Sequence, residues 1–340
     1  MSHTPPVRAK GPADLLALVP GLIGFHPEDS VVVLTVGEAT QPFHARVDLP
    51  GDPVAVEGLA RHLTRVATRN GVTRMACVLY TDDAGLAEAF GEELDRRLGE
   101  SSVDLVCMVR ADGERWWPLG VHPDGRAATR GTRYDVSTHP LMAQTVLDGT
   151  PVLGSRRELA DTLVGTDVDQ IGRVGALGDG ILARLGGALS APLGPRSRRH
   201  HLGLEGRWVR ECVRRCLEER RRLDEQEVAR LAVLISVSVD VRDVAWAEMD
   251  HANADRHVDL WRDVVRRVPA HLRAAPAALL GFSAWLSGDG ALAWCAVECA
   301  HDAEPGYSLA TLLSDALVGA VPPSVWRPFP REQLTLFAQA

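Results

Sequence analysis

The sequence predicts an α/β domain followed by an all-helical domain. In the first 165 residues, short β-branched runs alternate with amphipathic runs of helical period. After about residue 167 no strand-like alternation recurs. A chain of 340 residues also exceeds what one hydrophobic core usually serves. We therefore expect an α/β domain over residues 1–165 and a helical domain over residues 166–340.

The first two expected strands follow a short helix near residues 14–19. The β-branched run at 30–36 is typical of a strand buried on both faces, whereas 44–49 alternates as a half-exposed strand does. The turn between the two runs predicts that they pair as a hairpin. A helix then begins after its cap, Asp52, and ends at Asn70.

A second helix separates the next two expected strands, 74–80 and 103–109. Either Asp82 or Asp83 caps this helix, because both carboxylates stand directly before its first turn. A short strand at 115–119 completes the order ββαβαββ. This order implies a mixed sheet with flanking helices.

Two of these strands should lie inside the sheet. The runs at 30–36 and 74–80 are largely apolar and leave no polar face to show solvent. An irregular loop is expected over 120–138, and helical patterns follow near 139–147 and 156–163.

The second half contains one clear helix start. Asp224, with Glu227 three residues later, forms a capping box for a helix that we expect to run to about Met249. Before it, the Gly-, Pro- and Arg-rich stretch 186–206 is interpreted as a flexible connection.

Small residues recur at tetratricopeptide spacing within about 274–307. They would let two antiparallel helices, near 275–286 and 290–301, approach closely. The small residues concerned are Gly281, Ala293 and Ala300. A single unit of this kind must stack on neighbouring helices, because it cannot bury its own face.

Net charge, the N-terminal sequence and the number of cysteines exclude several classes of protein. The net charge of −8 excludes a global basic field that would recruit nucleic acid. Asp14 and Pro20 interrupt the apolar N-terminal run, so we expect a cytoplasmic protein with no signal peptide and no membrane contact. Six cysteines do not make a disulfide scaffold, and we assign them to core packing rather than to a metal.

Several short segments together resemble the actinobacterial family known as domain of unknown function 4192. The segments are Asp14-Leu15-Leu16, Pro20, Gly24-Phe25-His26-Pro27, Ser30-Val31-Val32-Val33, Asp48-Leu49-Pro50, Trp116-Trp117, Tyr134-Asp135, Val241-Arg242-Asp243 and Gly288-Asp289-Gly290-Ala291. The resemblance implies this two-part architecture and a cytoplasmic location, and it brings no activity with it. Many relatives carry cysteines in the loop after the tryptophan pair, whereas this chain has none between Cys107 and Cys212.

Polar and aromatic residues gather around the ends of the expected strands. Ligands of α/β sheets favour the carboxyl ends of strands, where Asp48, Tyr80 and Asp82 fall. Residues 26–29 instead precede the amino end of the strand expected at 30–36. Carboxylates with a histidine suit cation binding or acid–base chemistry, although Asp82 or Asp83 is also an ordinary helix cap. The candidate ligand-binding residues are His26, Glu28, Asp29, Asp48, Tyr80, Asp82, Asp83, Trp116, Trp117, Tyr134 and Asp135.

An arginine-rich segment over 196–222 is a second candidate. Clustered guanidinium groups can neutralise phosphates, but glutamates interleave with them, as expected of a solvated helix face. The candidate phosphate or nucleic-acid contacts are Arg196, Arg198, Arg199, Arg207 and Arg210.

The leading hypothesis is a cytoplasmic, non-enzymatic protein that binds a ligand or partner through its α/β half. Its helical half would mediate protein–protein contacts, and no cofactor or metal is predicted. One alternative is an enzyme, such as a metal-assisted hydrolase using His26, Asp48 and Asp82. Another is a nucleic-acid-associated protein using the arginine-rich segment.

Overall fold

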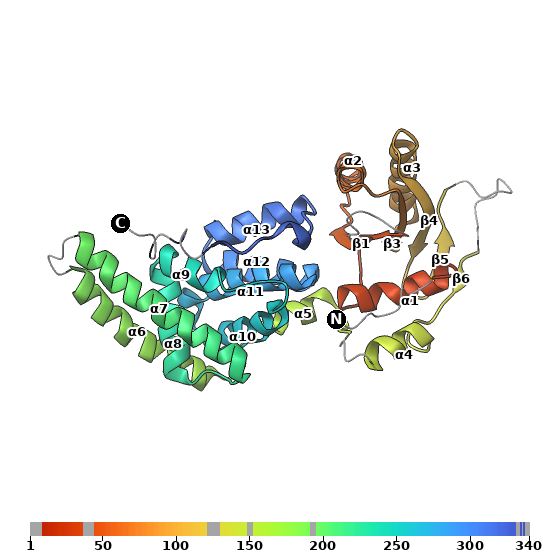
Figure 1. Cartoon of the computed structure of the whole chain (residues 1–340). Coiled ribbons are helices and arrows are strands. Elements are labelled where there is room, and N and C mark those ends of the chain that lie inside the picture. Colours follow the sequence, from red (N-terminus) through yellow and green to blue (C-terminus); the bar gives the residue numbers. More distant parts are fainter. Residues whose placement is uncertain are drawn as a thin grey trace. The chain divides into compact units, whose positions relative to one another are not determined.

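The computed structural model describes residues 9–36, 44–120, 130–147, 152–190, 195–330, 334 and 336. The chain divides into two compact units, Met1–Glu158 and Leu159–Ala340. The first contains the sheet and the second is helical, which confirms the predicted fold class (Figure 1). Among the described residues, no helix has both the length and the apolar character needed to cross a membrane.

The first unit is built on a six-stranded mixed sheet with the strand order β2-β1-β3-β4-β5-β6. The strands are β1 (Ser30–Thr35), β2 (His44–Asp48), β3 (Arg74–Tyr80), β4 (Asp104–Ala111), β5 (Arg115–Pro118) and β6 (Thr132–Arg133). Only β3 and β4 pair in parallel; the other described pairs are antiparallel. The predictions that β1 and β3 lie inside the sheet and that β1 and β2 form an antiparallel pair are both confirmed.

The strand register determines which segments meet at one sheet edge. Ser30, the first residue of β1, lies opposite Asp48 at the end of β2 and Tyr80 at the end of β3. Tyr80 in turn lies opposite Ala111 at the end of β4. The amino end of β1 therefore shares an edge with the carboxyl ends of three other strands.

Helices cover both faces of this sheet (Figure 1). On one face, α2 (Pro53–Arg69) and α3 (Ala84–Gly99) bury their apolar stripes, together with Val31, Val33 and Leu79, in a shared core. The Asp52 and Asp83 carboxylates accept hydrogen bonds from first-turn amides and cap the two helices. On the opposite face lies α1 (Pro12–Ile23), which packs against α4 (Pro140–Leu147).

The short β6 was missed from the sequence. The loop expected over 120–138 contains Thr132–Arg133, which pairs with β5. Two residues are too few to show the alternation by which a strand is recognised. Arg115 reinforces the pairing, because its guanidinium donates to the Gly131 carbonyl at 2.6 Å.

The second unit consists of packed helices. They are α6 (Val168–Ser190), α7 (Pro195–Glu219), α8 (Glu225–Val237), α9 (Val239–Trp246), α10 (Ala254–Arg267), α11 (Ala274–Ser287), α12 (Gly290–Ala303) and α13 (Ser308–Val318), with short 3₁₀ turns at Ala270–Leu272 and Pro323–Val325; α5 (Arg156–Asp161) joins the two units in sequence.

Two expectations for this unit were wrong. The capping box of Asp224 and Glu227 is present, but its helix stops at Val237 rather than near Met249. Ser238 adopts an extended backbone and caps α9, because its hydroxyl accepts from the Val241 amide. The stretch 186–206 is not a flexible connection in its described part, where 186–190 continue α6 and 195–206 belong to α7.

The expected pair of closely packed helices is present as α11 and α12. Gly281 faces this contact: a Cβ atom there would lie 2.9 Å from Leu313 Cδ2 and 3.3 Å from the Ala293 carbonyl oxygen. A Cβ atom at this position would require Leu313 to shift, and the Ala293 carbonyl leaves little room for a larger side chain. The tetratricopeptide character of the pair remains a prediction.

Replacing Gly281 by leucine should destabilise the second unit by about 1–3 kcal/mol, because the new side chain overpacks the α11–α12–α13 contact. The matched control is Gly172→Leu in α6, where no atom lies within 4 Å of the added Cβ. The control should leave stability unchanged or raise it by up to about 1 kcal/mol through helix propensity. Urea melts compare the two variants, and equal losses would contradict the packing.

A buried histidine makes the stability of the second unit depend on pH. The Trp261 indole donates to His257 Nδ1 at 3.3 Å, so Nε2 carries the proton toward the Glu248 carbonyl. Burial lowers the pKa of His257 to about 4. In the unfolded chain its pKa is about 6.5, so between these values the unfolded state binds the extra proton.

As pH falls from about 6.5 to 4, protonation of His257 in the unfolded chain should lower the free energy of unfolding of the wild type by on the order of 3 kcal/mol. Above pH 7 His257 should have no such effect. Urea melts across this pH range should show that the free energies of unfolding of the wild type and of His257→Gln differ less at acid pH, by that amount. A difference independent of pH would mean that His257 does not titrate as described.

Candidate functional site

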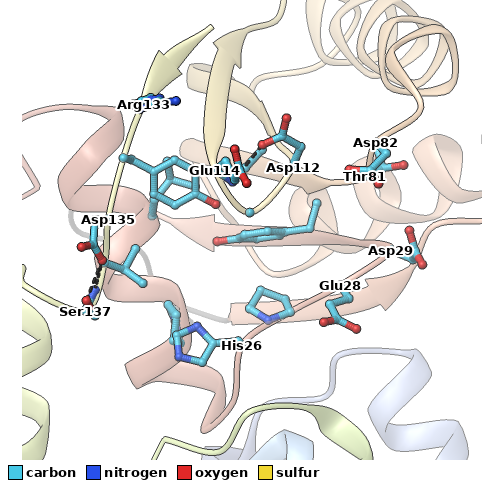
Figure 2. A pocket seen from close by; sticks show the side chains of 18 residues that line it. His26, Glu28, Asp29, Thr81, Asp82, Asp112, Glu114, Arg133, Asp135 and Ser137 are labelled. Carbon is cyan, nitrogen blue, oxygen red and sulfur yellow. Dashed lines mark hydrogen bonds between the residues drawn. The ribbon is translucent and has the colours of Figure 1, made fainter.

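A cavity of about 980 Å³ in the first unit opens at the shared sheet edge. We call it the edge cavity (Figure 2). Four segments line it: 26–29 before β1, 80–82 at the end of β3, 111–114 at the end of β4 and in the turn that follows, and 133–137 from the end of β6 onward. Leu16 and Pro20 of α1 complete the lining.

Backbone hydrogen bonds hold these segments together. The Thr81 amide donates to the Ala111 carbonyl at 3.0 Å, and the Tyr134 amide donates to the Glu114 carbonyl at 3.1 Å. The Asp29 carbonyl accepts from the Leu49 amide at 2.9 Å. Asp29 is held at φ +40°, a left-handed conformation that few residues other than glycine adopt. The rim is therefore built from fixed backbone rather than free loops.

Two buried hydroxyls at the edge have no described partner. Leu79 belongs to the core under α2 and α3, so its neighbour Tyr80 points to the opposite face, toward Leu16 and Pro20 of α1. Tyr80 is only 7% exposed, and its Oη makes no hydrogen bond within the described chain. The same holds for the Oγ of Ser30, which lies opposite Tyr80 in the sheet.

The Tyr80 hydroxyl is a neutral group. Burial raises its pKa well above the ordinary value for tyrosine, and the neighbouring Tyr134 hydroxyl adds to this shift. Burial also raises the pKa of Tyr134, against a hydrogen bond from the Gly113 backbone that lowers it. The cavity thus holds two protonated phenols that can donate as well as accept.

Carboxylates surround the cavity from several elements (Figure 2). Asp112 accepts hydrogen bonds from the amides of Glu114 and Arg115, which shapes the turn after β4. Asp135 accepts from the amide and hydroxyl of Ser137, and these bonds lower its pKa. Among the described residues, no group of three His, Cys, Asp or Glu side chains has the arrangement of a metal site.

The structure brings together seven of the predicted ligand-binding residues. They are His26, Glu28, Asp29, Tyr80, Asp82, Tyr134 and Asp135. The segment 26–29 reaches the carboxyl edge because β1 runs antiparallel to both of its neighbours.

Four other candidates lie outside the edge cavity. Asp48 is exposed and forms an ion pair with Arg46, and Asp83 caps α3. Trp116 and Trp117 are half-buried in β5, where Trp117 packs under the guanidinium of Arg110 at 3.8 Å. A position at the end of a predicted strand does not by itself show whether a side chain faces the cavity.

Several lining residues were missed from the sequence, namely Thr81, Asp112, Glu114, Arg133 and Ser137. Asp112 and Glu114 carried a usable signal, because they directly follow the buried strand β4. The residues after β6 carried none, since that strand was not recognised.

Arg110 positions the turn beside the cavity. It is nearly buried, and its Nη1 donates to the carbonyl oxygens of Thr81 at 3.2 Å and Asp82 at 3.4 Å. Stacking on Trp117 holds the guanidinium in place. It thereby fixes the end of β3, from which Tyr80 and Asp82 enter the cavity.

The arginine-rich candidate is only partly described. The side chains of Arg196 and Arg198 lie outside the described residues, whereas Arg199 and Arg207 are exposed on α7 and Arg210 is half-buried there. Several neighbouring arginines form ion pairs, including Arg214 with Glu248 at 2.5 Å. These contacts fit the interpretation of a charged helix face.

Comparison with known proteins places the chain in a family. The model of the family described as domain of unknown function (DUF4192) matches residues 12–324, so the chain belongs to that family. The match spans both units. No curated protein and no solved structure matches the chain.

Removing the Arg110 side chain should loosen the turn after β3. Arg110→Ala should lower the free energy of unfolding by about 1–3 kcal/mol, because the Thr81 and Asp82 carbonyls lose a charged donor. The matched control is Arg74→Ala at the exposed start of β3, with an expected cost below about 0.5 kcal/mol. Denaturant titration measures both, and equal costs would refute the positioning role.

Proposed function

We propose that this member of the DUF4192 family binds a small polar molecule in the edge cavity of its α/β unit. The proposal concerns binding rather than catalysis, in a cytoplasmic protein. A volume of about 980 Å³ lies within the range of pockets that hold small ligands.

The buried hydroxyl of Tyr80 is the observation that carries the proposal. A buried polar group without a partner costs about 1–3 kcal/mol. Tyr80 bears this cost beside a cavity, next to a second such hydroxyl on Ser30. A ligand that hydrogen-bonds to Tyr80 Oη would remove the cost, which explains why a phenol rather than a phenyl group stands there.

The enzymatic alternative has weaker support. A metal-assisted hydrolase using His26, Asp48 and Asp82 needs all three side chains at one cavity, because acid–base partners must reach one substrate. Asp48 is not part of the cavity lining and is paired with Arg46.

In the same proposal, the helical unit mediates contacts with a protein partner. Its support is the closely packed α11–α12 pair, which resembles in spacing the units from which partner-binding helical arrays are built.

Replacing Tyr80 by phenylalanine should raise the free energy of unfolding of the ligand-free protein by about 1 kcal/mol, since it removes an unpaired buried hydroxyl. The matched control is Tyr307→Phe. Its hydroxyl accepts from buried Arg242 at 3.3 Å, so this loss should cost about 1–2 kcal/mol. Denaturant melts would contradict the proposal if Tyr80→Phe were as destabilising as the control.

A thermal-shift screen tests binding directly. A library of small polar metabolites, including neutral, anionic and cationic compounds, should contain molecules that raise the Tm of the full chain. Their affinity for Tyr80→Phe should be about 3- to 10-fold weaker, and their affinity for Tyr307→Phe unchanged. A library without any such compound would overturn the proposed function.

A further inference from the structure

We propose that the ligand is a small organic cation with two or more separated ammonium groups, of the aliphatic polyamine class. This inference rests on the proposed function and specifies its ligand. It follows from the charges of the edge cavity, from which of them are free of protein partners, and from how they are spaced.

Negative charge dominates the lining. Among the described residues, six carboxylates line the edge cavity, against one guanidinium, that of Arg133, and the imidazole of His26. The carboxylates are Glu28, Asp29, Asp82, Asp112, Glu114 and Asp135. A cavity lined by one sign of charge concentrates ligands of the opposite sign.

Four of these carboxylates are free to meet a ligand. Asp112 and Asp135 already accept hydrogen bonds from backbone amides or Ser137. The other four carboxylates are exposed and, within the described chain, make no hydrogen bond and no ion pair. These are Glu28, Asp29, Asp82 and Glu114.

Neighbouring arginines do not neutralise the free carboxylates. The guanidinium of Arg46 pairs with Asp48 and donates to the Glu28 backbone carbonyl. Arg110 donates to backbone carbonyls and stacks on Trp117, and Arg115 donates to the Gly131 carbonyl. Each of these cations is thus bound to a group other than the four free carboxylates.

The spacing of the charges favours an extended cation. The labelled carboxylates come from separate segments around the cavity rather than from one point (Figure 2). Accordingly, no three potential ligands in the described chain are gathered as a metal ion requires. A flexible chain of methylenes between ammonium groups can reach several carboxylates and lie against Leu16 and Pro20.

The buried hydroxyl is an independent indication of the same ligand. Tyr80 Oη is buried, has no described partner and stays protonated, so an ammonium group that reaches it would supply the hydrogen bond that it lacks. The phenol rings of Tyr80 and Tyr134 also attract cations through their faces.

Calorimetric titration of the full chain can decide the charge of the ligand. The probes are three compounds with the same four-carbon chain: putrescine with two ammonium groups, butane-1,4-diol with none, and succinate with two carboxylates. Spermidine extends the series to three charges, and Mg²⁺ tests a compact cation. Putrescine and spermidine should bind at one site, spermidine more tightly, with affinities that fall as salt rises.

Isosteric variants locate the site. Glu114→Gln and Asp82→Asn should each weaken spermidine binding about tenfold, because each removes a charged acceptor. The matched controls are Glu92→Gln and Asp95→Asn, which remove the same charges from the exposed surface of α3. The controls should leave the affinity within about twofold.

The outcomes separate this inference from the proposed function. Equal weakening by cavity and control variants would show that spermidine meets only the general negative charge, and would overturn the inference. Tighter binding of Mg²⁺, of succinate or of the diol at the cavity would also overturn it while leaving the proposed function intact. If neither these probes nor the metabolite library bound, both would fail.

Discussion

The antiparallel pairing of β1 with both β2 and β3 is the constraint on which the first unit depends. Ser30 lies opposite Asp48 on one side and Tyr80 on the other, so the chain enters β1 at the edge where three other strands end. A parallel β1 would have placed His26 and Glu28 at the far edge. One choice of strand direction thus decides whether the polar residues meet.

At that edge the hydrogen bonding between strands is least complete. Backbone pairing ends there, and the connecting segments are fastened by a few bonds, such as those of Thr81 to Ala111 and Tyr134 to Glu114. Below them the sheet remains tightly packed, with Val31, Cys77 and Leu79 fully buried. A rigid apolar base carrying a polar, incompletely paired rim is the arrangement expected of a binding site.

Local sequence patterns were sufficient to predict most helices and strands. They were not sufficient to predict how distant segments lie relative to one another. The caps Asp52, Asp83 and Asp224 mark their helices because capping involves neighbouring residues. Strand direction and register depend on the whole sheet, so the position of residues 26–29 relative to Asp82 could not be read from spacing. Ser238 ended a helix inside an apolar run, where periodicity continues across the break. For the same reason, Asp48 and Asp82 looked equivalent as strand-end carboxylates, although only Asp82 faces the cavity.

Two buried arginines of the helical unit have charged or polar protein partners, whereas the edge cavity combines exposed carboxylates with a buried phenol that has none in the described chain. In the helical unit, Arg267 is bonded to Asp263 and the Leu223 carbonyl, and Arg242 to Asp243 and Tyr307. Such pairs offset the cost of removing a charge from water, and they leave little for a ligand to gain. At the edge cavity, carboxylates and a buried phenol stand together without protein partners in the described chain. Selection for stability alone would favour phenylalanine over Tyr80, since it removes a buried hydroxyl that has no described partner. The presence of the Tyr80 hydroxyl at this cavity is explained if a ligand supplies the missing partner.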